Sequence, residues 1–295
     1  MAVLNTYGTT AGNKEDIYDV LQLVSPEETP LFTRLPDSTA SATLHQWVEY
    51  TLATGSGNAA LEGAVTTGAT SSSKARKTNY TQIMEKNGAV SGTQRKVDNV
   101  GGADEFAFEM KKKMLEWKLG AESDLILQSA VSGGDATARS MNGLISAITT
   151  NRVTGSATTV ALTETAFNNL LQTIFENGAI VSSVYVNGFN KRRISQFATS
   201  NVRQLAMGET LKNRVSVYES DFGTVDIVLD RYVPKTIGIM LKDELFRKAW
   251  LRKPSTYPLA KRGDLDEFQI VGEWTLEHLN ERAGGILSAF ASATS

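Results

Sequence analysis

The triplet Asp221-Phe222-Gly223 is a candidate for chemistry, because an Asp-Phe-Gly sequence binds the catalytic metal ion in protein kinases. A kinase also needs a glycine-rich loop, a strand lysine and a His-Arg-Asp loop shortly before this triplet. The chain has no G-x-G-x-x-G sequence, and neither His45 nor His278 precedes the triplet at a suitable distance. The triplet lies between two runs rich in β-branched residues, and Gly223 can adopt the positive φ of a tight turn. We therefore interpret it as the turn of a β-hairpin.

Other residues that commonly support catalysis or bind metals give no stronger signal. The chain has no cysteine, which excludes thiolate catalysis, disulfides, cysteine-type zinc sites and iron–sulfur clusters. His45 and His278 lie in strand-like segments far apart in the sequence, so we interpret them as structural or surface histidines. There is no G-x-S-x-G nucleophile sequence, and the glycine-rich run at 55–63 lacks the Lys-Ser/Thr ending of a phosphate-binding loop. The sequence predicts no catalytic residue, no metal and no cofactor.

The charge balance restricts the partners that the chain can bind by electrostatics alone. The formal net charge is −2 at pH 7, whereas a protein that coats nucleic acid needs a clustered basic excess. This balance still allows a protein that encloses nucleic acid without gripping it. Two basic runs, 111–113 and 191–193, fall on predicted helices, and we interpret both as solvated or subunit-contacting faces, with nucleic-acid contact as the alternative.

Targeting and membrane signals are also missing from the sequence. The first residues show no basic segment followed by an apolar run, so we expect no signal peptide. No stretch approaches the roughly 18 consecutive apolar residues that suggest a membrane span. We expect a soluble protein that is made in a cytoplasm and does not bind a membrane.

The first segment combines a short amphipathic helix with an apolar arm. A helical stripe is formed by Ile17, Tyr18, Leu21 and Val24. Pro26, Pro30 and Pro36 then predict an extended arm, which remains apolar through Leu31, Phe32 and Leu35. Because an exposed apolar arm is unfavourable, it must be buried in its own fold or against a neighbouring subunit.

A long hairpin is predicted after the arm. Residues 43–52 alternate in the manner of a strand, and residues 77–97 resemble a returning strand pair. Between them, 53–73 consists of Gly, Ala, Ser and Thr, apart from Asn58, Leu61, Glu62 and Val65. Such a segment cannot build a core of its own, so we expect a hairpin that projects from the body.

The clearest helix in the sequence is predicted at 103–131. Acidic residues open it, a Gly-Gly pair ends it, and its apolar residues recur at spacings of three and four. That face contains Phe106, Met110, Met114, Trp117, Ala121, Leu125 and Gln128. From about residue 134, helices alternate with strands: helices at 163–178 and 190–200, a buried strand at 179–188, and strands through 214–234 and near the end. The fold class is α+β.

The order of these elements resembles the major capsid proteins of tailed bacteriophages, which have the Hong Kong 97-type fold. The opening "EDIYDVLQLVSPEETPLFTRLP" is similar to the start of one capsid subfamily. The runs "SSVYVNGFNKRRISQFA" and "YESDFGTVDIVLDRYVP" resemble a strand–helix unit and a Phe-Gly hairpin of the same family. The resemblance covers nearly the whole chain.

The resemblance implies a division of the chain into five parts. These are an N-terminal arm at 1–38, an extended β-hairpin loop with peripheral-domain strands at 39–97, the spine helix of the peripheral domain at 98–139, a mixed α/β axial domain at 140–250, and returning peripheral-domain strands at 251–295. For contacts between subunits we select apolar residues of the arm, the loop and the helix. These candidates are Leu31, Phe32, Leu61, Val65 and Trp117.

The resemblance also implies partners and a place in the virion. It implies self-assembly into hexamers and pentamers of an icosahedral shell that encloses double-stranded DNA without sequence specificity. It further implies a portal, a possible decoration protein, and a scaffold; because the arm starts almost at once, we expect a separate scaffolding protein. Lys74 and Lys77 lie near the loop, but no asparagine with an activating carboxylate can be matched to them, so no crosslink is predicted.

Two other functions fit parts of the sequence. A cargo-enclosing protein nanocompartment with the same fold would bind a cargo peptide on its inner face instead of a genome. An enzyme with an unfamiliar site would show turnover when the purified chain is assayed against nucleotides and esters. We favour the shell subunit of a phage because of the resemblance. The lack of a catalytic constellation argues against the enzyme, whereas the nanocompartment differs from the phage capsid only in its partners.

Overall fold

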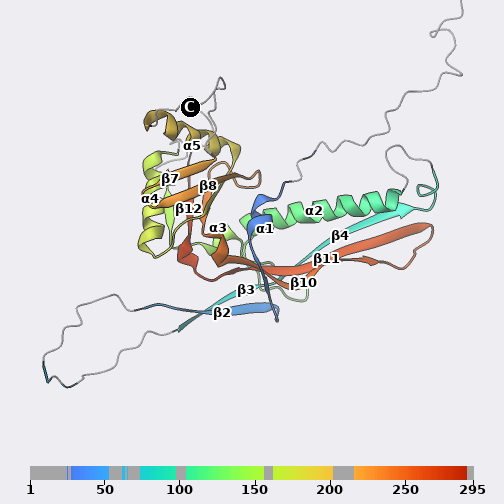
Figure 1. Ribbon diagram of the computed structural model, residues 1–295. Helices are drawn as coiled ribbons and strands as arrows, with labels where there is room; N and C mark the ends of the chain where they lie inside the picture. Colours follow the sequence, from blue (N-terminus) through green and yellow to red (C-terminus); the bar gives the residue numbers. More distant parts are fainter. Residues whose placement is uncertain are drawn as a thin grey trace, which may run out of the picture.

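The structure is a computed structural model that describes residues 25, 28–52, 62–63, 65, 74–97, 104–155, 162–201 and 216–290. The predicted helical stripe before Ser25 and most of the predicted hairpin tip lie outside these described residues. Two sheets with separate helices and a projecting hairpin make up the described part (Figure 1). Among the described helices, none is long and apolar enough to cross a membrane.

A four-stranded sheet and one long helix form the elongated part of the molecule (Figure 1). The order of its strands is β1 (Asp37–Thr39), β10 (Phe246–Pro258), β11 (Leu265–His278) and β4 (Gln82–Ser91). Strand β1 runs parallel to β10, and the other neighbours are antiparallel. Helix α2 (Glu105–Leu127) lies along one face of this sheet and packs against β4 and β11.

Helix α2 confirms the predicted helix and its apolar face. Asp104 caps its start, because the carboxylate accepts hydrogen bonds from the backbone N–H groups of Phe106 and Ala107. Trp117 is 1% exposed and donates its indole N–H to the carbonyl of Met84 at 3.1 Å. Opposite this ring, β11 has Gly272, where an added Cβ would lie 2.7 Å from the Trp117 ring. The helix ends four residues earlier than predicted, because the chain becomes extended at Gln128 and pairs Val131 with Ser140.

A six-stranded mixed sheet forms the second part. Its order is β5 (Arg152–Thr154), β12 (Gly284–Ser288), β9 (Gly238–Leu241), β6 (Ser183–Val186), β8 (Gly223–Leu229) and β7 (Val217–Ser220). Helices α3 (Leu144–Ala147), α4 (Glu164–Glu176) and α5 (Gly188–Asn201) accompany it. The predicted Thr cap of α4 is confirmed, since the Thr163 hydroxyl accepts from the N–H of Ala166 at 3.2 Å. The alternation of helices and strands confirms the α+β class.

The Asp-Phe-Gly triplet forms the turn between β7 and β8, as the sequence predicts. Gly223 has φ +128°, a conformation that favours glycine. The Ser220 hydroxyl accepts from the N–H of Phe222 and donates to the carbonyl of Gly223 at 2.9 Å, so it closes the turn. Asp221 is exposed at the tip. The triplet is therefore a local turn structure.

The projecting hairpin is built from β2 (Leu44–Tyr50) and β3 (Lys74–Tyr80), which pair antiparallel over seven residues each. Figure 1 shows it extending away from both larger sheets. Its base lies beside β11, and its tip contains residues 62, 63 and 65 as described positions. The predicted strand at 43–52 and the strand pair at 77–97 are confirmed as elements, but β3 begins earlier, at Lys74, and β4 ends at Ser91 in the four-stranded sheet.

Two segments differ from the expectations. The arm was expected to be extended, whereas Pro30–Arg34 forms the short helix α1, because Pro30 fits the first helical position and Glu122 accepts from two of its amides. Residues 251–295 were expected to return to the peripheral sheet. Strand β11 does so, but β12 crosses to the six-stranded sheet and pairs with β9 and β5, and β10 already begins at Phe246.

Candidate interaction surfaces

The predicted contact residues of the arm and the helix lie inside the subunit. Leu31 is 0% exposed, and Trp117 is 1% exposed. The Phe32 ring contacts Trp117, Trp250 and Trp274, with ring centroids 6.3, 6.0 and 5.4 Å away. We call these five residues the arm cluster. Burial within the subunit leaves little of Leu31 or Trp117 for another subunit, whereas Phe32 is half-buried. The selection of these three residues for contacts between subunits stays a prediction.

The two loop candidates have different outcomes. Val65 is 86% exposed, so its side chain is available for a contact outside its own subunit. Leu61 lies outside the described residues. Both stay predictions.

One face of the hairpin is turned toward the body of the subunit. Trp47 is buried and its ring lies 4.9 Å from that of His278, at a right angle. On the same face, His45 Nε2 lies 3.7 Å from Glu277 Oε1, and His278 Nδ1 lies 3.7 Å from Glu49 Oε1. Burial lowers the pKa of His278 to about 4, so this imidazole is neutral at neutral pH.

This arrangement places both histidines beside the Trp47 ring, although they are far apart in the sequence. They support the base of the hairpin, which agrees with the structural interpretation of both. Within the described residues, no group of three or more His, Asp or Glu side chains is arranged to hold a metal ion. No sequence signal could have paired them, since the contact depends on how the hairpin packs on β11.

The opposite face of the hairpin is exposed and combines apolar with basic side chains. Val48 and Tyr50 alternate with the buried positions of β2, and Leu52 follows them. Tyr50 is 71% and Leu52 85% exposed. Across the hairpin, Val48 pairs with Arg76 and Tyr50 with Lys74. We call these five residues the hairpin face.

The four-stranded sheet also has one face without a helix. Helix α2 covers the side with Met84 and Trp274, whereas the alternate residues of β4 are exposed on the other side. This sheet face consists of Ile83, Glu85, Asn87 and Ala89 from β4, Glu267, Gln269 and Val271 from β11, and Tyr257 from β10. Glu85 accepts from Gln269 at 2.7 Å. The sheet face therefore combines apolar side chains with two carboxylates.

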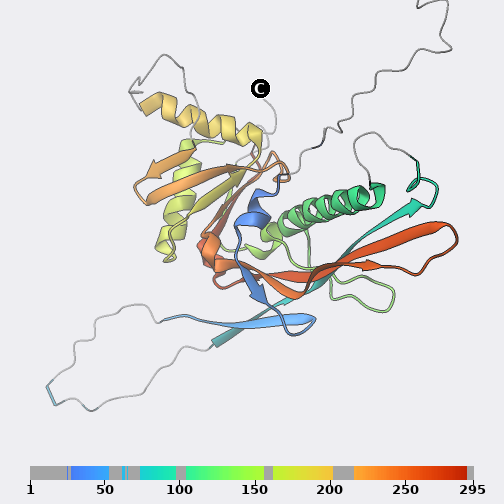
Figure 2. The same ribbon diagram turned by 45° about the vertical axis from the view of Figure 1, so that its right-hand side comes forward.

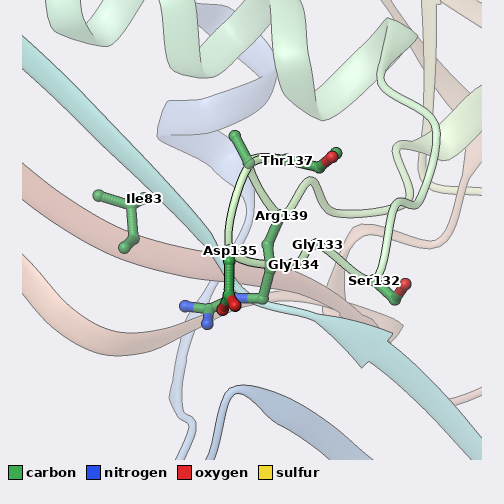
Figure 3. Close-up of a pocket in the computed structure, with 8 residues that line it drawn as sticks. Ile83, Ser132, Gly133, Gly134, Asp135, Thr137 and Arg139 are labelled. Atoms are coloured by element: carbon green, nitrogen blue, oxygen red, sulfur yellow. The ribbon is translucent and has the colours of Figure 1, made fainter.

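A hollow of about 480 Å³ lies at one end of the sheet face (Figure 3). Its walls are Ile83 on one side and the loop 132–139 on the other. Backbone pairing between Gly134 and Thr137 closes this loop, and Gly133 has φ +76°. Arg139 is held by Glu273 at 2.7 Å and by the carbonyl of Thr81 at 3.3 Å. The half-exposed Ile83 gives the hollow one apolar wall, whereas Ser132, Asp135, Thr137 and Arg139 make much of the remaining lining polar.

The two basic runs have different environments. On α2, Lys112 pairs with Glu109 at 3.2 Å and Lys113 with Glu116 at 2.9 Å, as expected for a solvated helix face. Lys191 is instead buried, and its ammonium donates to the carbonyl of Ile227 at 3.2 Å. The interpretation of residues 191–193 as a solvated or subunit-contacting run is therefore wrong at Lys191, because α5 packs this side chain against β8.

Sequence reasoning missed Glu122, which is 0% exposed at the centre of the molecule. Its two carboxylate oxygens accept from the backbone N–H groups of Leu31 at 2.9 Å and Phe32 at 2.6 Å. A weak signal was present. The short segment after Pro30 has no acidic residue in its first turn, so its free amides need an acceptor from elsewhere.

A comparison with known protein families gives a match for this chain. The family model of the SU10 major capsid protein matches residues 4–291. The comparison with curated proteins gives no match.

Solved structures with similar folds come from phages and from a bacterial compartment. The cyanophage A-1(L) capsid is 12% identical with a TM-score of 0.70, over 97% of this chain and 99% of that one. A chain of Microbacterium phage Oxtober96 is 10% identical with a TM-score of 0.69, over 97% and 99%. The holo-SrpI encapsulin complex of Synechococcus elongatus PCC 7942 is 11% identical with a TM-score of 0.64, over 100% and 98%. At these identities the likeness shows the fold, which confirms the predicted Hong Kong 97-type architecture.

Proposed function

The chain belongs to the SU10 major capsid protein family, so it is a phage major capsid protein located in the virion capsid, and from this premise we propose how its subunits join. The subunits assemble into hexamers and pentamers of an icosahedral shell around double-stranded DNA. In this proposal, the four-stranded sheet and α2 form the peripheral domain, and the six-stranded sheet forms the axial domain. We keep the five-part division of the chain proposed from its sequence, with one change: β12 belongs to the axial sheet.

We propose that the hairpin face of one subunit packs on the sheet face of its neighbour. The carrying observation is that the described residues leave both faces uncovered within the subunit, and that the two faces complement each other. The hairpin face offers Tyr50 beside Lys74 and Arg76. The sheet face offers Ile83 beside Glu85, with Glu267 further along the sheet opposite Ala89. Opposite charges orient such a contact, and the apolar side chains bury area on both sides.

The hollow at Ile83 is the place on the sheet face where we expect the neighbouring hairpin to bind. In the proposed contact, the Tyr50 ring of a neighbour packs against Ile83 at this hollow, its hydroxyl reaches the polar lining, and the basic residues of β3 face Glu85. Because each shell repeats the contact many times, a weak contact per subunit is sufficient for assembly.

A charge-reversal experiment tests the proposed contact. The double variant Lys74→Glu, Arg76→Glu should prevent closed particles, because it places like charges opposite Glu85 and Glu267. Adding Glu85→Lys and Glu267→Lys to the same chain restores opposite charges and should restore particles. Size-exclusion chromatography and negative-stain microscopy measure the yield of closed particles for the double and the quadruple variant. Circular dichroism checks that each variant is folded.

Lys235→Glu is the matched control, since Lys235 is exposed on a different surface and its reversal should leave assembly unchanged. Normal particles from the double variant, or no recovery in the quadruple variant when the chain remains folded, would contradict the contact.

The remaining partners follow from the same proposal. We expect a separate scaffolding protein, a portal and packaged DNA without sequence specificity, and no catalytic activity. A decoration protein would bind the outside of the assembled shell.

A nanocompartment shell is the second candidate, because the encapsulin of Synechococcus elongatus has a similar fold. The family match favours the phage capsid. Particles isolated from the natural source should contain nuclease-protected double-stranded DNA; particles filled with a protein cargo would favour the compartment.

A further inference from the structure

Helix α1 lies where the two sheets of the subunit meet (Figure 2). Its first turn is bound by Glu122 of α2, and Lys248 of β10 donates to the carbonyl of Phe32 at 2.7 Å. Its last residue, Arg34, donates to Ser183 of β6 at 2.8 Å and to Asp226 of β8 at 3.2 Å. The helix therefore joins the four-stranded sheet to the six-stranded sheet through polar contacts on both sides.

A second carboxyl group lies beside Glu122. Asp230 follows β8, is 2% exposed, and is within hydrogen-bonding reach of the Glu122 carboxyl. One of its oxygens, Oδ1, accepts from the N–H of Tyr232 at 2.8 Å. The other, Oδ2, is buried and has no hydrogen-bond donor among the described residues. A single proton held between the two carboxyl groups would give Oδ2 the partner that it lacks.

The charged groups around this pair offer no direct compensation. From the segment after β8, Asp230 and the Tyr232 hydroxyl face Glu122, and both carboxylates raise the pKa of that phenol, with burial as the larger cause. From β10, Lys248 is occupied by the Phe32 carbonyl and by Asp37 at 3.1 Å. From α1, Arg34 is occupied by Ser183 and Asp226.

We propose that Glu122 and Asp230 share one proton, and that loss of this proton loosens α1 from the junction between the two sheets. With one proton present, the pair carries a single charge that the two α1 amides stabilise. Without it, two buried negative charges face each other in a site with no free cation in the described residues. Burial, followed by the charge of Asp230, raises the pKa of Glu122 to about 8, and burial also raises the pKa of Asp230.

The arm cluster provides a direct readout. Phe32 of α1 packs against three tryptophans, so movement of α1 exposes indole rings to water. The full-length subunit is titrated from about pH 6 to about pH 9.5 while tryptophan emission is recorded. We expect a red shift with a midpoint near pH 8, with unchanged circular dichroism. Hydrogen exchange of the Leu31 and Phe32 amides should be at least ~10-fold faster above the midpoint than in Asp230→Asn at the same pH.

Two variants make the test specific. Asp230→Asn keeps the shape of the side chain, still accepts from Tyr232, and can donate to an ionised Glu122, so it should abolish the transition. Glu122→Gln removes the titrating group and should abolish it as well. Asp221→Asn, at the exposed β7–β8 turn, is the matched control and should keep the transition.

The proposal is overturned if the parent shows no transition, or if Asp230→Asn retains the transition at the same midpoint. These measurements on unassembled subunits do not depend on the proposed contact between subunits.

Discussion

Two apolar segments border the four-stranded sheet: α1, which enters the junction with the six-stranded sheet, and the β2–β3 hairpin, which projects from the body (Figures 1 and 2). Both were expected to contact neighbouring subunits. The side chains of the arm cluster pack against one another inside the subunit, whereas Tyr50 and Leu52 of the hairpin remain exposed. Apolar character alone therefore does not identify an intersubunit surface. The distinguishing feature is an exposed apolar row next to Lys74 and Arg76, which form no ion pair within the described residues.

The largest effect on the stability of the subunit is expected in the arm cluster. Trp117→Ala should lower the free energy of unfolding by roughly 3–5 kcal/mol, because it removes a buried aromatic ring and leaves a cavity beside Gly272 and Phe32. Thermal or urea unfolding of the subunit measures the change, and assembly should fail along with stability. An unchanged melting temperature would show that the arm cluster does not stabilise the fold.

An intermediate effect is expected on the inward face of the hairpin. The pKa of His278 is lowered from 6.5 to about 4 by burial, so the unfolded chain binds its proton at a higher pH than the folded chain does. Stability from this group is present above pH 6.5 and is lost as pH falls toward 4. From pH 7.5 to 5.5 the loss should be about 1.4 kcal/mol. Urea unfolding at several pH values measures it.

His278→Gln is the variant that assigns this dependence. It should flatten the stability profile between pH 6.5 and 4. Any loss below pH 4.5 should persist in it, because carboxylates with lowered pKa values, Glu281, Asp37 and Asp266, are protonated in that range. Burial would raise the pKa of Glu281, but donors from Thr149 and Thr150 outweigh it and lower the pKa to about 2. A profile identical to that of the parent would assign the dependence between pH 6.5 and 4 to other groups.

The smallest effect on subunit stability is expected at the hairpin face. Tyr50→Ala should change the free energy of unfolding by less than about 0.5 kcal/mol, because the side chain is exposed and makes few contacts within its subunit. The same variant should reduce the yield of closed particles. Comparing its unfolding curve with that of Trp117→Ala separates stability from assembly. A large loss of subunit stability in Tyr50→Ala would mean that the hairpin face is part of the folded core.

The sequence predicted most elements of the fold, because their signals are local. The apolar spacing of α2, the Thr163 cap of α4 and the turn at Gly223 each depend on neighbours a few residues away. The order of these elements also carried the resemblance to the capsid fold. The exposure of Val65 was equally predictable, since the surrounding residues are too small to bury it.

Other features depend on contacts between distant parts of the chain, which local patterns do not contain. Glu122 binds amides 90 and 91 residues away, Trp47 and His278 meet only because the hairpin packs on β11, and β12 crosses between the sheets. The sequence by itself determined which segments are helices, strands and turns, because backbone propensity and periodicity are local. The tertiary structure alone decided which apolar and charged side chains are buried together, because burial depends on the packing of the whole chain.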